Sequence, residues 1–128
     1  MAKKGLYFVE YFGSELRETN QGDSRKTGKT CLVNNECTKV GKFQRGLDQR
    51  QKEYDRDIGN VKLHLAFNGD HLSNEENYDL EKKVLKELKE YRMRNPYTNR
   101  LTENLKGIGF KELKNVIDQL TNQGRIVN

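Results

Sequence analysis

The sequence contains two cysteines, one proline and no tryptophan among its 128 residues. No apolar run approaches the roughly 20 residues that a membrane-spanning helix needs. Cys31 and Cys37 lack the second cysteine pair or the nearby histidines of a zinc site, and a single disulfide is unusual in a lysine-rich chain. We therefore interpret both as ordinary strand residues. Glu10 interrupts the apolar residues near the N-terminus, so we expect no export signal and a cytoplasmic protein.

Hydrophobic residues make up 33% of the sequence and charged residues 34%. This balance predicts a thin core with long polar loops, and the length predicts one domain, residues 1–128. The net charge is +5, and residues 1–50 carry most of it, with ten Lys or Arg against six Asp or Glu. A basic half is typical of proteins that bind a polyanion.

Three parts of the sequence have the pattern of β-strands. Residues 5–12 are rich in aromatic and β-branched side chains, which favour strands. Residues 30–33 and 37–41 flank two asparagines that tolerate the positive φ of a tight turn, so these residues predict a hairpin. In residues 61–67, apolar side chains alternate with Lys, His and Ala, which is the period of a half-buried strand.

Three further segments predict helices. Residues 44–56 form a polar one. Residues 74–94 follow Ser73, whose spacing to Glu76 is that of a capping box, and their apolar side chains form one buried stripe that ends before the single proline. Residues 110–122 have a similar apolar face.

The order of these segments predicts an α+β fold, with a small, mostly antiparallel, three-stranded sheet flanked by helices. The polar segment 13–29 contains three glycines and no sustained period. It predicts a long, flexible loop.

Basic residues and a tyrosine surround the predicted strand-to-helix junction at residues 38–54, "TKVGKFQRGLDQRQKEY". A phosphodiester hydrolase needs cations for the phosphate charge, a carboxylate for a divalent cation and a group that activates water. Glu81, early in the next predicted helix, is a carboxylate at the border of the core, although a glutamate there also fits a helix-dipole interaction. Glu81, Tyr7 and the basic residues of the junction could together supply the carboxylate, the water-activating group and the cations, if the predicted hairpin and the helix of Glu81 share a face.

Two short motifs, "GLY" at Gly5–Tyr7 and "KVG" at Lys39–Gly41, resemble the two halves of the signature of the GIY-YIG endonuclease family. Lysine stands where the second half of that signature has a tyrosine. The segment between the motifs is longer than the family's short hairpin, which makes residues 13–29 an insertion. Further residues that match the family's pattern are Lys42, Arg50, Tyr54, Glu81 and Asn99.

The resemblance implies a metal-dependent endonuclease that hydrolyses DNA phosphodiester bonds with Mg²⁺ or Mn²⁺. Glu81 is then the metal ligand, and Arg50 binds the phosphate. Tyr54 orients a phosphate oxygen or the metal-bound water.

The resemblance also implies a proton acceptor. Tyr7 takes the proton from the attacking water, which requires a lowered pKa, and Lys39 and Lys42 are expected to supply the positive charge that lowers it. Expected DNA contacts outside the reaction centre are Arg25, Lys26, Lys29, Arg45 and Asn99.

Two alternatives stay open from the sequence. Lys39 and the altered closing element Glu103–Leu105 favour a DNA-binding module that keeps the nuclease scaffold without cleavage. An interaction or inhibitor protein from a mobile element is the other alternative. The oligomeric state is also open, with a homodimer among the choices.

Overall fold

The computed structural model describes residues 1–19 and 30–122. In this part of the chain, the structure has seven strands and three α-helices, with one short 3-10 helix. In chain order they are β1 (Gly5–Tyr11), β2 (Arg17–Glu18), β3 (Leu32–Val33), β4 (Cys37–Phe43), α1 (Leu47–Asp57), β5 (Val61–Asn68), α2 (Asn74–Glu87), η2 (Lys89–Tyr91), β6 (Arg92–Arg94), β7 (Leu101–Lys106) and α3 (Phe110–Asn122). None of these helices is long and apolar enough to span a membrane.

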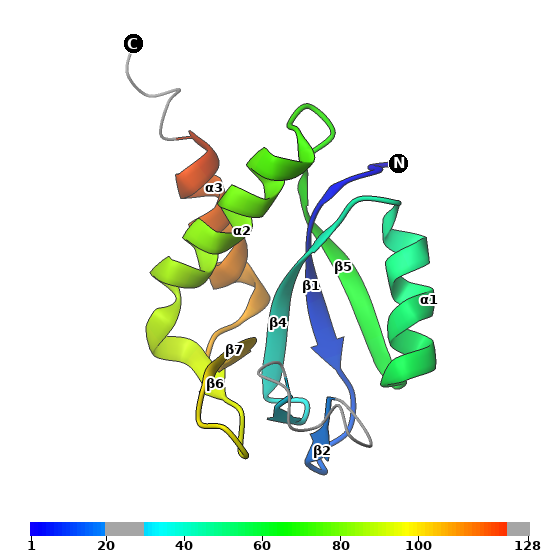
Figure 1. The fold of residues 1–128 in the computed structure, drawn as a ribbon, viewed down its shortest axis with the longest axis vertical. Coiled ribbons are helices and arrows are strands. Elements are labelled where there is room, and N and C mark those ends of the chain that lie inside the picture. Colours follow the sequence, from blue (N-terminus) through cyan, green and yellow to red (C-terminus); the bar gives the residue numbers. More distant parts are fainter. Residues whose placement is uncertain (20–29, 123–128) are drawn as a thin grey trace.

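Five of the strands form one antiparallel sheet in the order β5-β1-β4-β7-β6, while β2 and β3 form a separate two-stranded sheet. The α+β fold is therefore confirmed, but the prediction of three strands was wrong. β1 pairs with β4 on one side and with β5 on the other along nearly its whole length. In Figure 1, α1 lies on one side of the strands and α2 with α3 on the other.

The sheet separates two hydrophobic cores, because side chains of a strand alternate between its faces. On β1, Leu6 and Phe8 pack with α2 and α3 in one core. Tyr7, Val9 and Tyr11 belong to the other core, which also contains the buried α1 residue Tyr54.

The alternation predicted for residues 61–67 holds only in part. Val61 and Leu63 are buried as expected, but Leu65 is 47% exposed and Ala66 is buried instead. β5 contains one extra residue at Ala66, since Tyr7 pairs with Leu65 whereas Leu6 pairs with Phe67. This β-bulge reverses the face of Phe67, which packs against the core of Leu6 and Phe8 and not against that of Leu63.

The predicted hairpin of residues 30–41 was wrong. A turn does form there, with the Cys37 N–H donating to the Asn34 carbonyl at 3.0 Å. The strands on its two sides enter different sheets, because β3 pairs with β2 and β4 pairs with β1. Of the predicted loop 13–29, residues 20–29 lie outside the described part of the chain.

The helix predicted for residues 74–94 begins where expected but ends seven residues earlier than predicted. Ser73 and Glu76 form the capping box, with both side-chain-to-backbone bonds at 3.0 Å. The helix stops at Glu87, and the chain then forms η2 and the β6–β7 hairpin. Pro96 lies in the turn of this hairpin, where the Asn95 side chain accepts two backbone N–H bonds.

The third predicted helix is confirmed as α3, with Leu113 and Ile117 fully buried. Its first residue, Phe110, is 38% exposed and stacks on Phe8. Both cysteines are buried free thiols.

Candidate active site

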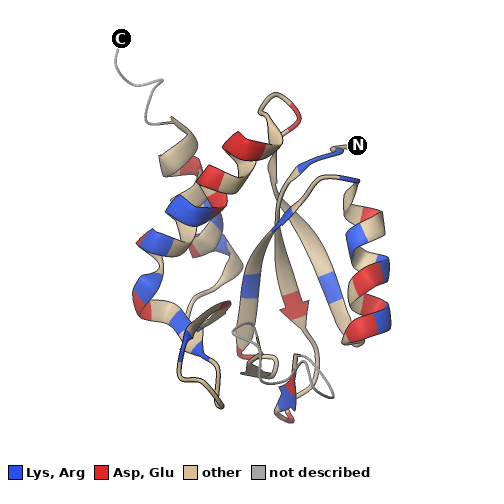
Figure 2. Ribbon diagram, viewed as in Figure 1, with Lys and Arg blue, Asp and Glu red and all other residues tan. Residues whose placement is uncertain are grey.

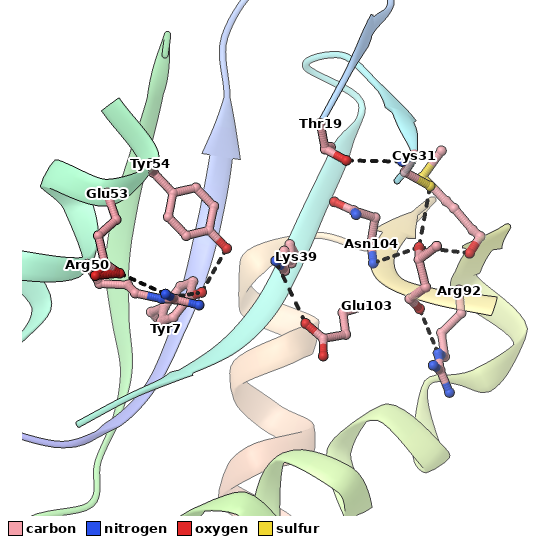
Figure 3. A network of polar contacts seen from close by, with 12 residues as sticks. Tyr7, Thr19, Cys31, Lys39, Arg50, Glu53, Tyr54, Arg92, Glu103 and Asn104 are labelled. Carbon is pink, nitrogen blue, oxygen red and sulfur yellow. Dashed lines mark hydrogen bonds and ion pairs between the residues drawn. The ribbon is translucent and has the colours of Figure 1, made fainter. Parts of the chain in front are cut away.

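Tyr7, Tyr54 and Arg50 form a contiguous polar group between β1 and α1, in which both tyrosines are buried and Arg50 is partly exposed. The Tyr7 and Tyr54 hydroxyls are 2.7 Å apart, and the rings meet edge to face. Arg50 Nε donates to the Tyr7 hydroxyl at 3.3 Å. The three side chains point toward one another in Figure 3, although they come from a strand and a helix far apart in sequence.

Gly41 provides the space that the Tyr7 ring occupies. The two residues are direct partners across the β1–β4 pair. A Cβ atom at position 41 would lie 2.3 Å from both the ring carbon Cζ and the hydroxyl oxygen of Tyr7. The glycine of the "KVG" motif is thus required by close packing against a fully buried tyrosine.

Gly41→Ala is therefore expected to destabilise the protein by about 1–3 kcal/mol, because the buried ring has to move. Urea unfolding followed by circular dichroism measures the change. Gly109→Ala is the matched control, since a Cβ there would have its nearest neighbour at 3.9 Å. Equal unfolding midpoints for the two variants would contradict the packing role of Gly41.

Arg50 is held by one carboxylate and two aromatic rings. Its Nη1 atom pairs with Glu53 Oε1 at 2.8 Å, one turn further along α1. The guanidinium carbon lies 5.9 Å from the Tyr7 ring centre and 5.6 Å from that of Tyr54. The guanidinium has five N–H donors, and these two polar contacts use two of them.

Lys39 reaches the same group from β4. Its ammonium nitrogen lies 5.3 Å from the centre of the Tyr54 ring and 3.7 Å from Glu103 Oε2 of β7. Next to Glu103, the buried Asn104 accepts a hydrogen bond from the Tyr11 hydroxyl at 2.6 Å. In Figure 3, Lys39 and Glu103 lie on the side of Tyr7 and Tyr54 that is away from Arg50.

The expectation of a lowered Tyr7 pKa was wrong. Burial raises the pKa of Tyr7 well above its usual value, the nearby Tyr54 adds to the effect, and the charges of Lys39 and Arg50 offset only part of it. Burial likewise raises the pKa of Tyr54 to about 12. Both phenols are therefore neutral in the free protein at neutral pH.

These pKa shifts predict a loss of stability in alkali. Tyr7, Tyr11 and Tyr54 all have pKa values raised by burial, so the folded state favours the protonated phenols. Their contribution is complete below the unfolded value near 10 and is lost as the pH rises through the folded values. Between its unfolded and its folded pKa, each tyrosine lowers the free energy of unfolding by about 1.4 kcal/mol per pH unit. Three tyrosines together lower it by about 4 kcal/mol per pH unit.

Urea unfolding at a series of pH values between about 9 and 12 tests this slope. Tyr7→Phe removes one of the three ionising groups and should reduce the slope by about a third. A free energy of unfolding that stays constant through about pH 11 would contradict the pKa shifts.

Glu81 lies in α2, and its residue is 7% exposed. Its charge acts on Tyr54, where it raises the pKa together with Glu103. The position of Glu81 was predicted at the border of the core, and its side chain is buried.

The donor set around Glu81 suits a magnesium or manganese ion. Carboxylate oxygens are hard ligands, and Mg²⁺ is commonly held by one or two carboxylates, with water and substrate phosphate as the other ligands. No cluster of three or more His, Cys, Asp or Glu residues that could enclose a metal occurs in residues 1–19 and 30–122.

Lys42 does not join the tyrosine group. It pairs with Leu6 across the β1–β4 register, and Leu6 and Val40 face the core under α2 and α3. The expectation that Lys42 lowers the Tyr7 pKa was therefore wrong, because alternate residues of a strand face opposite sides. Lys42 borders a surface hollow at the start of α1, together with Arg45 and Arg50.

Asn99 is the remaining predicted contact that belongs to the described part of the chain. Asn99 lies in the β6–β7 turn, has a φ of 61° and accepts a hydrogen bond from Arg94 through its carbonyl. Arg25, Lys26 and Lys29 lie outside the described residues.

Sequence reasoning missed the two carboxylates that pair with the basic residues. The pairing of Arg50 with Glu53 has a sequence signal, since residues three apart are neighbours on a helix. The pairing of Lys39 with Glu103 has none, because it depends on the unpredicted strand β7.

No model of a known protein family matches the chain, and neither do any curated proteins or solved structures. The site is therefore interpreted from its own residues and geometry.

Proposed function

We propose that this protein is a metal-dependent endonuclease of the GIY-YIG type that hydrolyses DNA phosphodiester bonds. The observation that carries the proposal is the group formed by Tyr7, Tyr54 and Arg50, with the hydroxyls 2.7 Å apart and Arg50 Nε 3.3 Å from Tyr7. These residues match the signature positions of the family by sequence order. Their side chains also converge, which their spacing in the sequence alone does not require.

The chain's own cations can bind and polarise a phosphate. Arg50 lies between two hollows, one bordered by Lys42 and Arg45 and the other by Lys39 and Arg56. Its planar guanidinium suits a bidentate contact with phosphate oxygens, and the pair with Glu53 holds it in place. Arg50 thus stabilises the charge that develops on the phosphate in the transition state.

Three further side chains complete the proposed reaction. Tyr7 first releases its own phenolic proton to solvent, and the phenolate oxygen then accepts the proton of the attacking water. Tyr54, hydrogen-bonded to Tyr7, holds that oxygen in place. Glu81 holds the Mg²⁺ or Mn²⁺ ion. When bound, such an ion neutralises negative charge on the phosphate and on the leaving oxygen.

The experiment is the incubation of supercoiled plasmid with the protein and Mg²⁺ or Mn²⁺, with and without chelator. Chelator-sensitive nicking or linearisation is the expected result. A protein that neither cleaves nor binds the plasmid overturns the proposal.

One observation favours a second candidate, a DNA-binding module without cleavage. Tyr7 is 0% exposed, and its raised pKa keeps it protonated at neutral pH. A buried neutral phenol is a poor proton acceptor. A shift of the plasmid in a gel without any cleavage, in either metal, would establish this second function.

A further inference from the structure

An exposed tyrosine on α2 is flanked by two lysines. Tyr78 is 47% exposed. The ammonium nitrogen of Lys82 lies 4.9 Å from the centre of its ring, and that of Lys42 lies 5.8 Å from the same point. Lys82 is four residues further along the same helix, whereas Lys42 comes from the neighbouring strand β4. Two ammonium groups, one from α2 and one from β4, therefore lie near the ring of Tyr78.

Two ammonium groups near one ring concentrate positive charge at this place on the surface, and such charge attracts an anion. The ring attracts each ammonium by about 0.5–1 kcal/mol at an exposed site, which restricts the long lysine side chains before any ligand binds. This arrangement suits a phosphate group, because lysine binds phosphate as a point charge.

The lysine pair is continuous with the candidate active site. Lys42 borders the hollow that also contains Arg45 and Arg50. Basic side chains therefore extend from α1 over β4 to α2. Figure 2 shows Lys and Arg positions on all three elements.

We propose that Lys42, Tyr78 and Lys82 bind a backbone phosphate of the DNA strand that neighbours the phosphate held by Arg50. This inference rests on the proposed function and extends it. It gives Lys42 a binding role in place of the catalytic one, and it sets the path of the DNA from α1 across β4 onto α2. Tyr78 acts as a positioning residue, since its ring holds both lysines.

The test measures binding of a fluorescent DNA duplex by anisotropy at several salt concentrations, with chelator present so that no cleavage occurs. Lys42→Gln and Lys82→Gln should each reduce the slope of log affinity against log salt by about 0.9, the value for one phosphate contact. Tyr78→Leu removes no charge, yet it should weaken binding about two- to fivefold because the lysines lose their ring. Tyr78→Phe keeps the ring and should bind like the wild type.

Lys83→Gln is the matched control. It removes the same charge from the same helix, but Lys83 borders a different hollow that it shares with Glu76, Asp79 and Asp118. If the wild type binds and the Lys42 and Lys82 variants behave like Lys83→Gln, the inference is overturned while the proposed function stands. If Tyr78→Leu binds like the wild type, the positioning role of the ring is overturned. A wild type that does not bind the duplex overturns both proposals.

Discussion

Arg50→Ala is expected to reduce the rate of DNA cleavage by about 10²- to 10³-fold, the usual cost of losing one preorganised donor to a developing negative charge. The guanidinium donates to Tyr7 at 3.3 Å and lies over the rings of Tyr7 and Tyr54. Removing it takes away the phosphate ligand and one of the charges that oppose the rise of the Tyr7 pKa. Single-turnover cleavage of plasmid at saturating protein measures the effect.

Two further variants sharpen this prediction. Arg50→Lys should restore little activity, because one ammonium cannot reproduce the planar donor geometry that bridges Tyr7 and Glu53. Arg45→Ala, at the exposed edge of the same hollow, should mainly weaken DNA binding and lower its salt dependence. Cleavage that depends more on Arg45 than on Arg50 would mean that the motif arginine lies five residues earlier in the sequence.

Glu81→Gln is expected to abolish cleavage while folding and DNA binding are retained. The substitution keeps the size and shape of a buried side chain and removes only its charge. Loss of a carboxylate ligand to a divalent cation costs several kcal/mol of transition-state stabilisation, or about 10³-fold or more in rate. Circular dichroism and anisotropy in chelator establish that the variant is folded and binds DNA.

Glu87→Gln provides the matched control for this substitution. It removes the same charge from an exposed position at the end of the same helix. Its cleavage rate should equal that of the wild type. Near-wild-type cleavage by Glu81→Gln would show that Glu81 serves the helix and that its assignment as metal ligand is incorrect.

The sequence predicts the parts of the fold in which hydrophobic side chains follow the period of the backbone. The start of α2 and helix α3 belong to this class, and β5 belongs to it in part, whereas β1 was predicted from its aromatic and β-branched residues. β7 does not, because its buried positions include Thr102 and Asn104. Thr102 donates to the Met93 carbonyl at 2.9 Å and Asn104 accepts from Tyr11 at 2.6 Å. Both partners lie on other strands, so the sequence of β7 alone does not show that these polar side chains are buried. A strand whose buried face is polar gives no hydrophobic alternation, and the sheet is therefore wider than predicted.

The sequence indicated that Tyr7 and Lys39 could act together, and in the structure both lie next to Tyr54. Lys42 illustrates the limit, since its position in the motif did not reveal that it lies on the opposite face of β4. The pKa of Tyr7 shows a second limit: sequence spacing identifies nearby charges, whereas burial, which dominates here, depends on the packed structure.

The way α1 is attached to the sheet also has a consequence for motion. Tyr54 is the one buried residue of α1. In contrast, β1 is hydrogen-bonded to a strand on each edge and packs against a core on each face. Segments with few buried apolar contacts open at a lower free energy than the strands of the core. A local opening of α1 would therefore withdraw Arg50 and Tyr54 together and leave Tyr7 in the sheet. Arg50 is thus carried by a helix with one buried residue, and Tyr7 by a central strand of the sheet.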